Sequence, residues 1–229
     1  MSMVHDELPK YLLAPEVSAL LHYVPDLRRK MLLATLWNTG ARINEALALT
    51  RGDFSLAPPY PFVQLATLKQ RTEKAARTAG RTPAGQQTHR LVPLSDSWYV
   101  SQLQTMVATL KIPLERRNKR TGRTEKARIW EVTDRTVRTW IGEAVAAAAT
   151  DGVTFSVPVT PHTFRHSYAM HMLYAGIPLK VLQSLMGHKS ISSTEVYTKV
   201  FALDVAARHR VQFSMPESDA VTMLKNRHA

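Results

Sequence analysis

The chain has 229 residues, of which 45% are hydrophobic, so it can bury a sizeable core in one large domain or two small ones. It contains no cysteine, which excludes disulfides, thiolate-bound metals and cysteine nucleophiles and fits a cytoplasmic protein. Thirty Lys and Arg against eighteen Asp and Glu give a net charge of +12, which favours a polyanionic partner, either nucleic acid or an anionic membrane surface.

The first part of the chain is expected to form three helices. Residues 14–16, Ala-Pro-Glu, open the first helix, because proline fits the first turn. The second runs from Leu27 to Trp37 and is closed by Gly40, since glycine readily takes the left-handed conformation that ends many helices. The third covers residues 41–49.

Two short strands are predicted next, over residues 61–68 and 89–94. The segment between them, residues 70–88, would then be an unusually long hairpin loop. A further helix is expected over residues 97–110.

The second half of the chain is expected to be mainly helical. Thr133 or Asp134 caps the first of its helices, and Gly176 and Gly187 end the next two. Ser192 and Glu195 have the spacing of a capping box at the start of the last. The ranges are 134–148, 163–175, 178–186 and a segment that begins near residue 192. The predicted fold class is therefore mainly α with a small antiparallel β-sheet (α+β), in one domain.

Two basic stretches carry most of the excess charge. Residues 69–90 have a net charge of +5 and residues 111–128 a net charge of +6. Both are rich in loop-forming residues, and neither has the hydrophobic face of a membrane-surface helix. Basic loops of this kind suit contact with a phosphate backbone, so nucleic acid is the better partner. The residues that we expect to make such contacts are Arg71, Lys74, Arg77, Arg81, Arg90, Arg116, Arg117, Lys119 and Arg120.

Four short segments have residue types suited to phosphate chemistry, although each is a weak signal alone. A lone arginine at a helix start is usually a salt-bridge partner, and a histidine within a helix is usually packed in a core. The segments are Thr39-Gly40-Ala41-Arg42-Ile43-Asn44-Glu45, Pro161-His162-Thr163-Phe164-Arg165-His166, Leu185-Met186-Gly187-His188 and Thr194-Glu195-Val196-Tyr197.

In this order and spacing, the four segments together resemble the catalytic domain of the tyrosine recombinases, also called the phage integrase family. His188 follows Arg165 by 23 residues and Tyr197 follows His188 by nine, and both intervals match the family pattern. Phe164 and Met186 stand where leucine is usual, and both keep an apolar side chain. The resemblance covers residues 12–200, preceded by a lead over 1–11 and followed by a tail over 201–229.

The resemblance implies that the protein cuts and rejoins DNA at specific sites through a 3′-phosphotyrosine intermediate. Tyr197 would be the nucleophile, and Arg42 and Arg165 would pair with the non-bridging phosphate oxygens. His188 would donate a further hydrogen bond. His162 would accept or orient the tyrosine proton.

Glu45 lies one turn after Arg42 and is expected to support that arginine or a histidine. In this family the general acid is a lysine on a hairpin of the small sheet. Lys69, directly after the first predicted strand, is the natural candidate, and Lys74 is the second choice because the loop is expanded.

The resemblance also implies an integrase, resolvase or invertase that acts on double-stranded bacterial or plasmid DNA, without cofactor or metal. It implies a homotetramer on the synapsed sites, formed from free monomers or dimers. The tail over residues 201–229 is expected to dock on a neighbouring protomer. The lead is so short that we expect a short form without the usual N-terminal DNA-binding domain.

Three alternatives compete with this interpretation. The helices over residues 163–175 and 178–186 could form the helix-turn-helix of a regulator. A type IB topoisomerase-like enzyme would share the chemistry and lack the specific site. His162 and His166 have i,i+4 spacing suited to a metal, but no third ligand has an obvious spacing.

Overall fold

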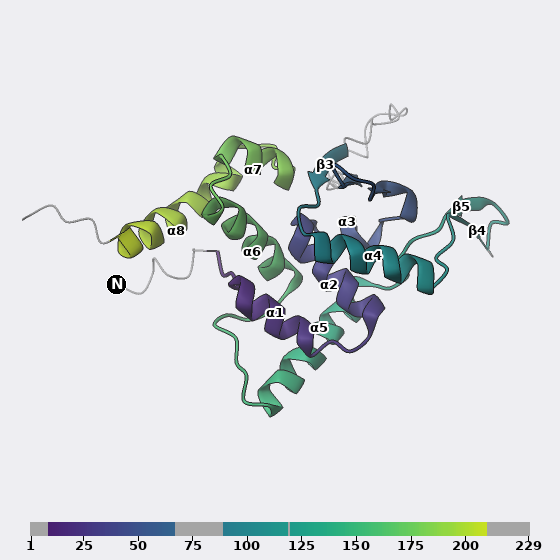
Figure 1. Ribbon diagram of the computed structural model, residues 1–229, viewed down its shortest axis with the longest axis horizontal. Coiled ribbons are helices and arrows are strands. Elements are labelled where there is room, and N and C mark those ends of the chain that lie inside the picture. The colour runs from purple at the N-terminus through teal and green to yellow at the C-terminus, as the bar shows by residue number, and fades with distance from the viewer. Residues whose placement is uncertain (1–8, 67–88, 119, 210–229) are drawn as a thin grey trace, which may run out of the picture.

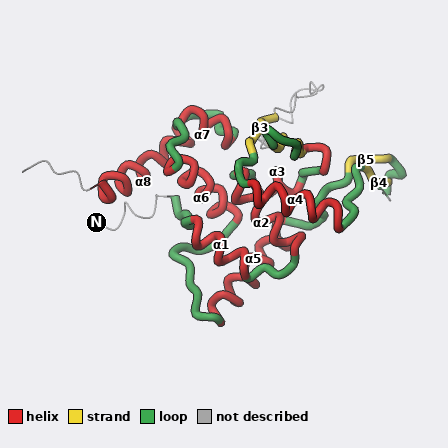
Figure 2. Tube along the Cα trace, in the orientation of Figure 1, coloured by secondary structure: helices red, strands yellow, loops and turns green. Residues whose placement is uncertain are grey.

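The computed structural model describes residues 9–66, 89–118 and 120–209, with side chains up to residue 202. Figure 2 shows that helices make up most of this part of the chain. The helices are α1 (Ala14–His22), α2 (Leu27–Thr39), α3 (Ile43–Leu47), α4 (Ser97–Thr109), α5 (Asp134–Thr150), α6 (Pro161–Tyr174), α7 (Leu179–Met186) and α8 (Ser192–His209), with one 3-10 turn at Arg51–Asp53. The strands are β1 (Phe54–Ser55), β2 (Phe62–Ala66), β3 (His89–Pro93), β4 (Glu115–Arg117) and β5 (Thr124–Lys126).

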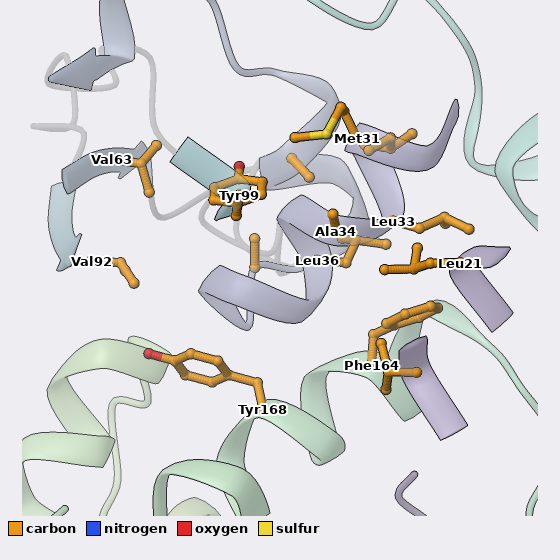
Figure 3. Close-up of a cluster of buried hydrophobic side chains, with 14 of the residues drawn as sticks. Leu21, Met31, Leu33, Ala34, Leu36, Val63, Val92, Tyr99, Phe164 and Tyr168 are labelled. Atoms are coloured by element: carbon orange, nitrogen blue, oxygen red, sulfur yellow. The ribbon is translucent and has the colours of Figure 1, made fainter. Parts of the chain in front are cut away.

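Helix α2 lies at the centre of the fold. Every residue from Met31 to Leu36 is buried, and a helix that is buried on all sides needs partners on all sides. Helices α4 and α6 both pack against α2. Figure 3 shows Phe164 and Tyr168 of α6 on one side of α2, and Val63 and Val92 of the small sheet further along it.

The end of α2 depends on a glycine. Gly40 has a φ of +59°, and an added Cβ atom there would lie 2.3 Å from Cδ1 of Tyr168 on α6. Both the left-handed conformation and the close approach of Tyr168 therefore require glycine. The prediction that Gly40 ends this helix is confirmed, and Arg42 follows only two residues later.

The three-stranded sheet is antiparallel, in the order β1-β2-β3. Val63 pairs with Val92, and Leu65 pairs with Arg90. Since side chains alternate across a strand, Arg90 and Val92 both face inward from β3. The two predicted strands are confirmed, and β3 carries an arginine into the interior.

Three local predictions are wrong. The predicted third helix over residues 41–49 is only one turn long, because Arg42 is its extended N-cap. The stretch over residues 111–128 contains the hairpin β4–β5, in which Arg116 pairs with Glu125. The amides of Thr194 and Glu195 donate to the carbonyl of Ile191, so Ile191 and not Ser192 precedes helix α8. Helix α8 itself continues past residue 200 and ends at His209.

In the described ranges, no helix is both long and apolar enough to span a bilayer.

Candidate active site

Arg42 occupies the N-cap of the short helix α3. Its backbone N–H donates to Oε2 of Glu45 at 2.9 Å, and its Nη1 donates to Oε1 of the same carboxylate at 2.9 Å. Glu45 is buried, whereas the Arg42 side chain is 37% exposed. The guanidinium is therefore anchored by a buried carboxylate while part of it can reach a ligand.

Arg90 approaches the same carboxylate from the sheet. Its Nη2 donates to Glu45 Oε2 at 2.5 Å and its Nη1 to Oε1 at 3.2 Å, while Nε donates to the carbonyl of Leu185 at 2.8 Å. Burial opposes ionisation of Glu45, but Arg90 and then Arg42 hold the pKa of that carboxyl below its ordinary value. The expectation that Arg90 contacts a DNA backbone is wrong, because its side chain is only 7% exposed and is engaged within the protein.

Arg165 links two segments that are far apart in sequence. Its Nη1 donates to the carbonyl of Gly40 and its Nη2 to the carbonyl of Met186, at 2.5 and 2.6 Å. These carbonyls lie just before Arg42 and just before the Gly187-His188 turn. Burial, and then the positive charges of Arg42 and Arg90, lower the pKa of Arg165 to about 10, so it stays protonated at neutral pH.

His188 follows the left-handed Gly187 that ends α7. Its N–H donates to the carbonyl of Gln183 at 3.1 Å, and its Nδ1 lies 2.9 Å from Oγ1 of Thr194. Burial lowers the pKa of His188 to about 4, helped by the nearby charge of Arg165. The ring is therefore neutral at physiological pH, with one nitrogen held by Thr194.

Tyr197, on the second turn of α8, is only 2% exposed. Its ring lies parallel to that of His188, with 6.4 Å between centroids and an interplanar angle of 6°. Its hydroxyl lies 2.9 Å from Nδ1 of His166. Burial raises the pKa of Tyr197, so the hydroxyl is protonated in this state of the protein.

Where the chain is described, it is His166 and not His162 that contacts the tyrosine hydroxyl. His162 is exposed in the first turn of α6. Sequence reasoning included His166 in the motif but gave it no role in proton transfer. The position of His166 directly after Arg165 is the sequence feature that could have indicated that it lies near Tyr197.

The structure thus brings together Arg42, Glu45, Arg165, His188 and Tyr197 from four separate segments. Arg42 and Arg90 are ion-paired with the Glu45 carboxylate, and Arg165 lies close enough to feel the charges of all three. The cluster therefore keeps a net positive charge of about +2, which suits it to binding an anion such as a phosphodiester.

A family model described as "Phage integrase family" matches residues 10–203. The chain belongs to this family. It is similar, with 98% identity over 229 residues that cover all of this chain and 88% of the relative, to a protein named "Resolvase" from Escherichia coli. It is 49% identical over 217 residues, covering 95% of this chain and 81% of the relative, to a "Probable site-specific recombinase in afa region" from the same species.

The fold of this integrase-family chain is also that of solved recombinases. The structure of XerA recombinase matches with a TM-score of 0.61 and 19% identity, covering 90% of this chain and 67% of that one. The post-cleavage complex of XerH with palindromic difH substrate matches with a TM-score of 0.62 and 18% identity, covering 92% and 55%. The predicted family and the mainly α fold class are therefore confirmed.

The other predicted residues of this family member fall into two groups. Exposed side chains Arg117 and Arg120 belong to the hairpin β4–β5, which Figure 1 shows at one end of the molecule. Arg116, on the same hairpin, is ion-paired with Glu125 and Glu131. The remaining predicted residues lie outside the described ranges: Lys69, Arg71, Lys74, Arg77, Arg81 and Lys119.

A metal site receives no support from the described residues, in which no group of three or more His, Cys, Asp or Glu side chains is placed to hold an ion. His166, one member of the i,i+4 histidine pair, is instead bonded to Tyr197.

Proposed function

We propose that this site-specific recombinase cuts double-stranded DNA by direct attack of Tyr197 on a phosphodiester. One observation carries the proposal. Arg165 bonds the carbonyls that precede Arg42 and Gly187-His188, and the His188 ring lies parallel to that of Tyr197. The segments of Arg42, Arg165 and His188 are thereby tied together, with His188 beside the ring of Tyr197.

The chemistry follows from the charges in this cluster. As the tyrosine oxygen adds to phosphorus, negative charge grows on the two non-bridging oxygens. Guanidinium groups can pair with these oxygens bidentately and keep their protons throughout. Arg42 can reach the phosphate because it is partly exposed, while Arg165 fixes the local backbone and adds positive charge. The phosphotyrosine retains the energy of the broken phosphodiester, so rejoining needs neither ATP nor a metal ion.

The leaving 5′-oxygen needs a proton, and a lysine on the β2–β3 connection is our candidate for its source. Ala66 and His89 are the last described pair of the β2–β3 ladder, and His89 is next to Arg90, which bonds Glu45. The described end of that ladder is therefore adjacent to the cluster. Lys69 follows Ala66 by three residues and remains our first choice, with Lys74 second.

We infer that DNA is held along its backbone by exposed basic side chains. Arg117 and Arg120 on the hairpin β4–β5 are two of these, and the basic residues of 70–88 would extend the contact. The relatives XerH and Tn1549 integrase are described as bound to their DNA substrates, which supports DNA as the partner. A tetramer on two synapsed sites, with the tail over residues 201–229 docking between protomers, completes the proposal.

The decisive experiment is covalent trapping. A nicked DNA substrate, from which a short cleaved fragment diffuses away, should leave wild-type protein attached through Tyr197. Tyr197→Phe should form no such adduct while it binds DNA with nearly unchanged affinity, since one hydroxyl adds little to phosphate-dominated binding. Cleavage should persist in EDTA. An adduct with the Phe variant would show that another residue is the nucleophile, and a strict metal requirement would contradict the mechanism.

A further inference from the structure

Helix α7 ends directly before the Gly187-His188 turn, and side chains from other elements complete its C-terminal end. The last carbonyls of a helix lack partners within the helix. Arg90 Nε donates to the carbonyl of Leu185 at 2.8 Å, and Arg165 Nη2 donates to that of Met186 at 2.6 Å. Both arginines belong to the candidate active site, so the end of α7 is bonded directly to that cluster.

His188 itself is held at both polar groups of its backbone by one residue, Gln183 on the last turn of α7. The His188 N–H donates to the Gln183 carbonyl at 3.1 Å, and the His188 carbonyl accepts from Nε2 of the Gln183 side chain at 3.2 Å. Gln183 is buried, so water competes little for these bonds. A backbone held at both groups has little freedom to rotate, and the direction in which the His188 ring leaves it is fixed as well.

The orientation of the Gln183 amide follows from its two neighbours. Lys180 Nζ, one turn earlier on α7, lies 2.9 Å from Gln183 Oε1. An ammonium can only donate and a backbone carbonyl can only accept, so Oε1 faces Lys180 and Nε2 faces His188. The reverse orientation would place donor against donor and acceptor against acceptor. Lys180 therefore keeps the donating end of the amide directed at His188.

We propose that Gln183 is a positioning residue for His188, and that Lys180 acts through Gln183 by fixing its amide. This inference rests on the proposed function, in which His188 donates a hydrogen bond to the phosphate that Tyr197 attacks. A preorganised donor lowers the barrier because it already points to the place where negative charge develops. Thr194 contacts the ring of His188 at Nδ1, whereas Gln183 holds the backbone from which that ring projects.

Two substitutions at position 183 remove the donor in different ways. Gln183→Glu keeps the size of the side chain and can pair with Lys180, but it presents only oxygen atoms to the His188 carbonyl. Gln183→Met keeps an unbranched chain and removes both polar contacts. Because removing a preorganised donor typically costs about 10²–10³ in rate, misplacing His188 should slow single-turnover cleavage by about 10- to 100-fold at saturating DNA. The DNA affinity of Gln183→Met should stay within about twofold of wild type, since phosphate contacts dominate binding.

Gln104→Glu is the matched control. Gln104 also donates from Nε2 to a backbone carbonyl, that of Leu56 at 3.4 Å, but from an exposed position on α4. The control therefore has the same change in charge as Gln183→Glu and loses the same kind of hydrogen bond. It should cleave at the wild-type rate.

A double-mutant cycle separates positioning of His188 from a general structural effect. In a His188→Ala background, Gln183→Met should slow cleavage no further, because the ring that Gln183 positions is absent. Lys180→Met, at an exposed position, should cause a smaller loss than Gln183→Met. That loss should disappear in the Gln183→Met background and in the His188→Ala background. A merely structural role would give losses that add.

Three results would overturn the inference. The first is wild-type cleavage by both Gln183 variants, the second is an undiminished loss for Gln183→Met in the His188→Ala background, and the third is a defect confined to DNA affinity. Melting temperatures show which variants fold, and Lys180→Met with and without His188→Ala decides the question if the Gln183 variants do not. Wild-type cleavage by Lys180→Met would overturn the role of Lys180. Wild-type cleavage by His188→Ala, or an adduct formed by Tyr197→Phe, would instead overturn the proposed function.

Discussion

Glu45 and Arg90 form a buried ion pair in which Nη2 lies 2.5 Å from Oε2, with side chains that are 1% and 7% exposed. The pair joins α3, whose N-cap is Arg42, to strand β3 of the small sheet. Because Arg90 Nε also bonds the carbonyl of Leu185, the same side chain supports the end of α7 just before Gly187 and His188. Arg90 is therefore a positioning residue for two motifs at once.

Arg90→Gln should destabilise the protein without changing the salt dependence of its DNA binding. Loss of one partner leaves Glu45 buried with Arg42 alone, and breaking a buried pair typically costs about 3–5 kcal/mol in free energy of unfolding. Denaturant unfolding measures this loss. Arg117→Gln, on the exposed hairpin, is the control and should leave stability unchanged while it lowers the salt dependence of DNA binding. The opposite pattern would mean that Arg90 contacts DNA after all.

We predict that the hydroxyl of Thr194, which lies 2.9 Å from Nδ1 of His188, sets which nitrogen of that ring carries the proton. If Thr194 Oγ1 donates to Nδ1, the neutral ring holds its proton on Nε2, where it can donate to a phosphate oxygen. Thr194→Val keeps the shape of this fully buried side chain and removes the donor. It should slow cleavage about tenfold, the equivalent of a typical net hydrogen bond of about 1 kcal/mol or somewhat more.

Thr194→Ser should restore most of that rate, and nitrogen NMR shifts of His188 would report the tautomer directly. Thr198→Val, one turn further along α8, removes a hydroxyl that bonds only the Glu195 carbonyl in the described structure. It should cleave as wild type does. Equal losses in both valine variants would point to a general effect on α8 and away from the tautomer.

Gly40→Ala should be strongly destabilising, because the new Cβ would meet Tyr168 at 2.3 Å in a left-handed backbone conformation. The left-handed conformation alone costs an alanine about 1–2 kcal/mol, and the clash adds to this. Gly142→Ala in α5 is the matched control. No atom lies within 4 Å of its added Cβ, so it should stabilise the helix by up to about 1 kcal/mol. Thermal unfolding of both variants measures the contrast.

The sequence predicted the parts of the site that depend on local rules. Gly40 and Gly187 ended helices where expected, and the order of the motifs located Arg42, Arg165, His188 and Tyr197. The inward direction of Arg90 could also have been predicted, since it alternates with the apolar Val92 on one face of β3. This alternation was overlooked because Arg90 was counted with the other basic residues of 69–90 as a candidate DNA contact.

Other features depend on tertiary contacts that no local pattern displays. The bond between His166 and Tyr197 joins two helices across 31 residues of sequence, and spacing alone could not show which histidine of α6 faces α8. The hairpin β4–β5 was not predicted because its basic composition is typical of a loop. Its strands are stabilised by the cross-strand pair of Arg116 with Glu125, which the overall charge count does not distinguish from free charges.

The expanded β2–β3 connection should contribute to DNA affinity through charge. Residues 70–88 contain Arg71, Lys74, Arg77 and Arg81 against Glu73, a net of +3. If this segment neutralises about three phosphates, replacing its four basic residues with glutamine should lower the slope of log affinity against log salt by about 2.7, at roughly 0.9 per phosphate. Sequence preference should change little, because backbone contacts position the protein and do not read bases.

Binding measured at several salt concentrations, alongside single-turnover cleavage, tests this prediction without shortening the chain. An unchanged slope in the four-glutamine variant would contradict a DNA-contacting role for the segment. Lys69→Ala and Lys74→Ala, made singly, then locate the general acid. The correct lysine should lose cleavage on ordinary DNA and regain it on a substrate whose 5′-bridging oxygen is replaced by sulfur, because a thiolate leaves without needing a proton. Rescue of Lys74→Ala but not of Lys69→Ala would place the acid inside the expanded segment and show that our first choice is wrong.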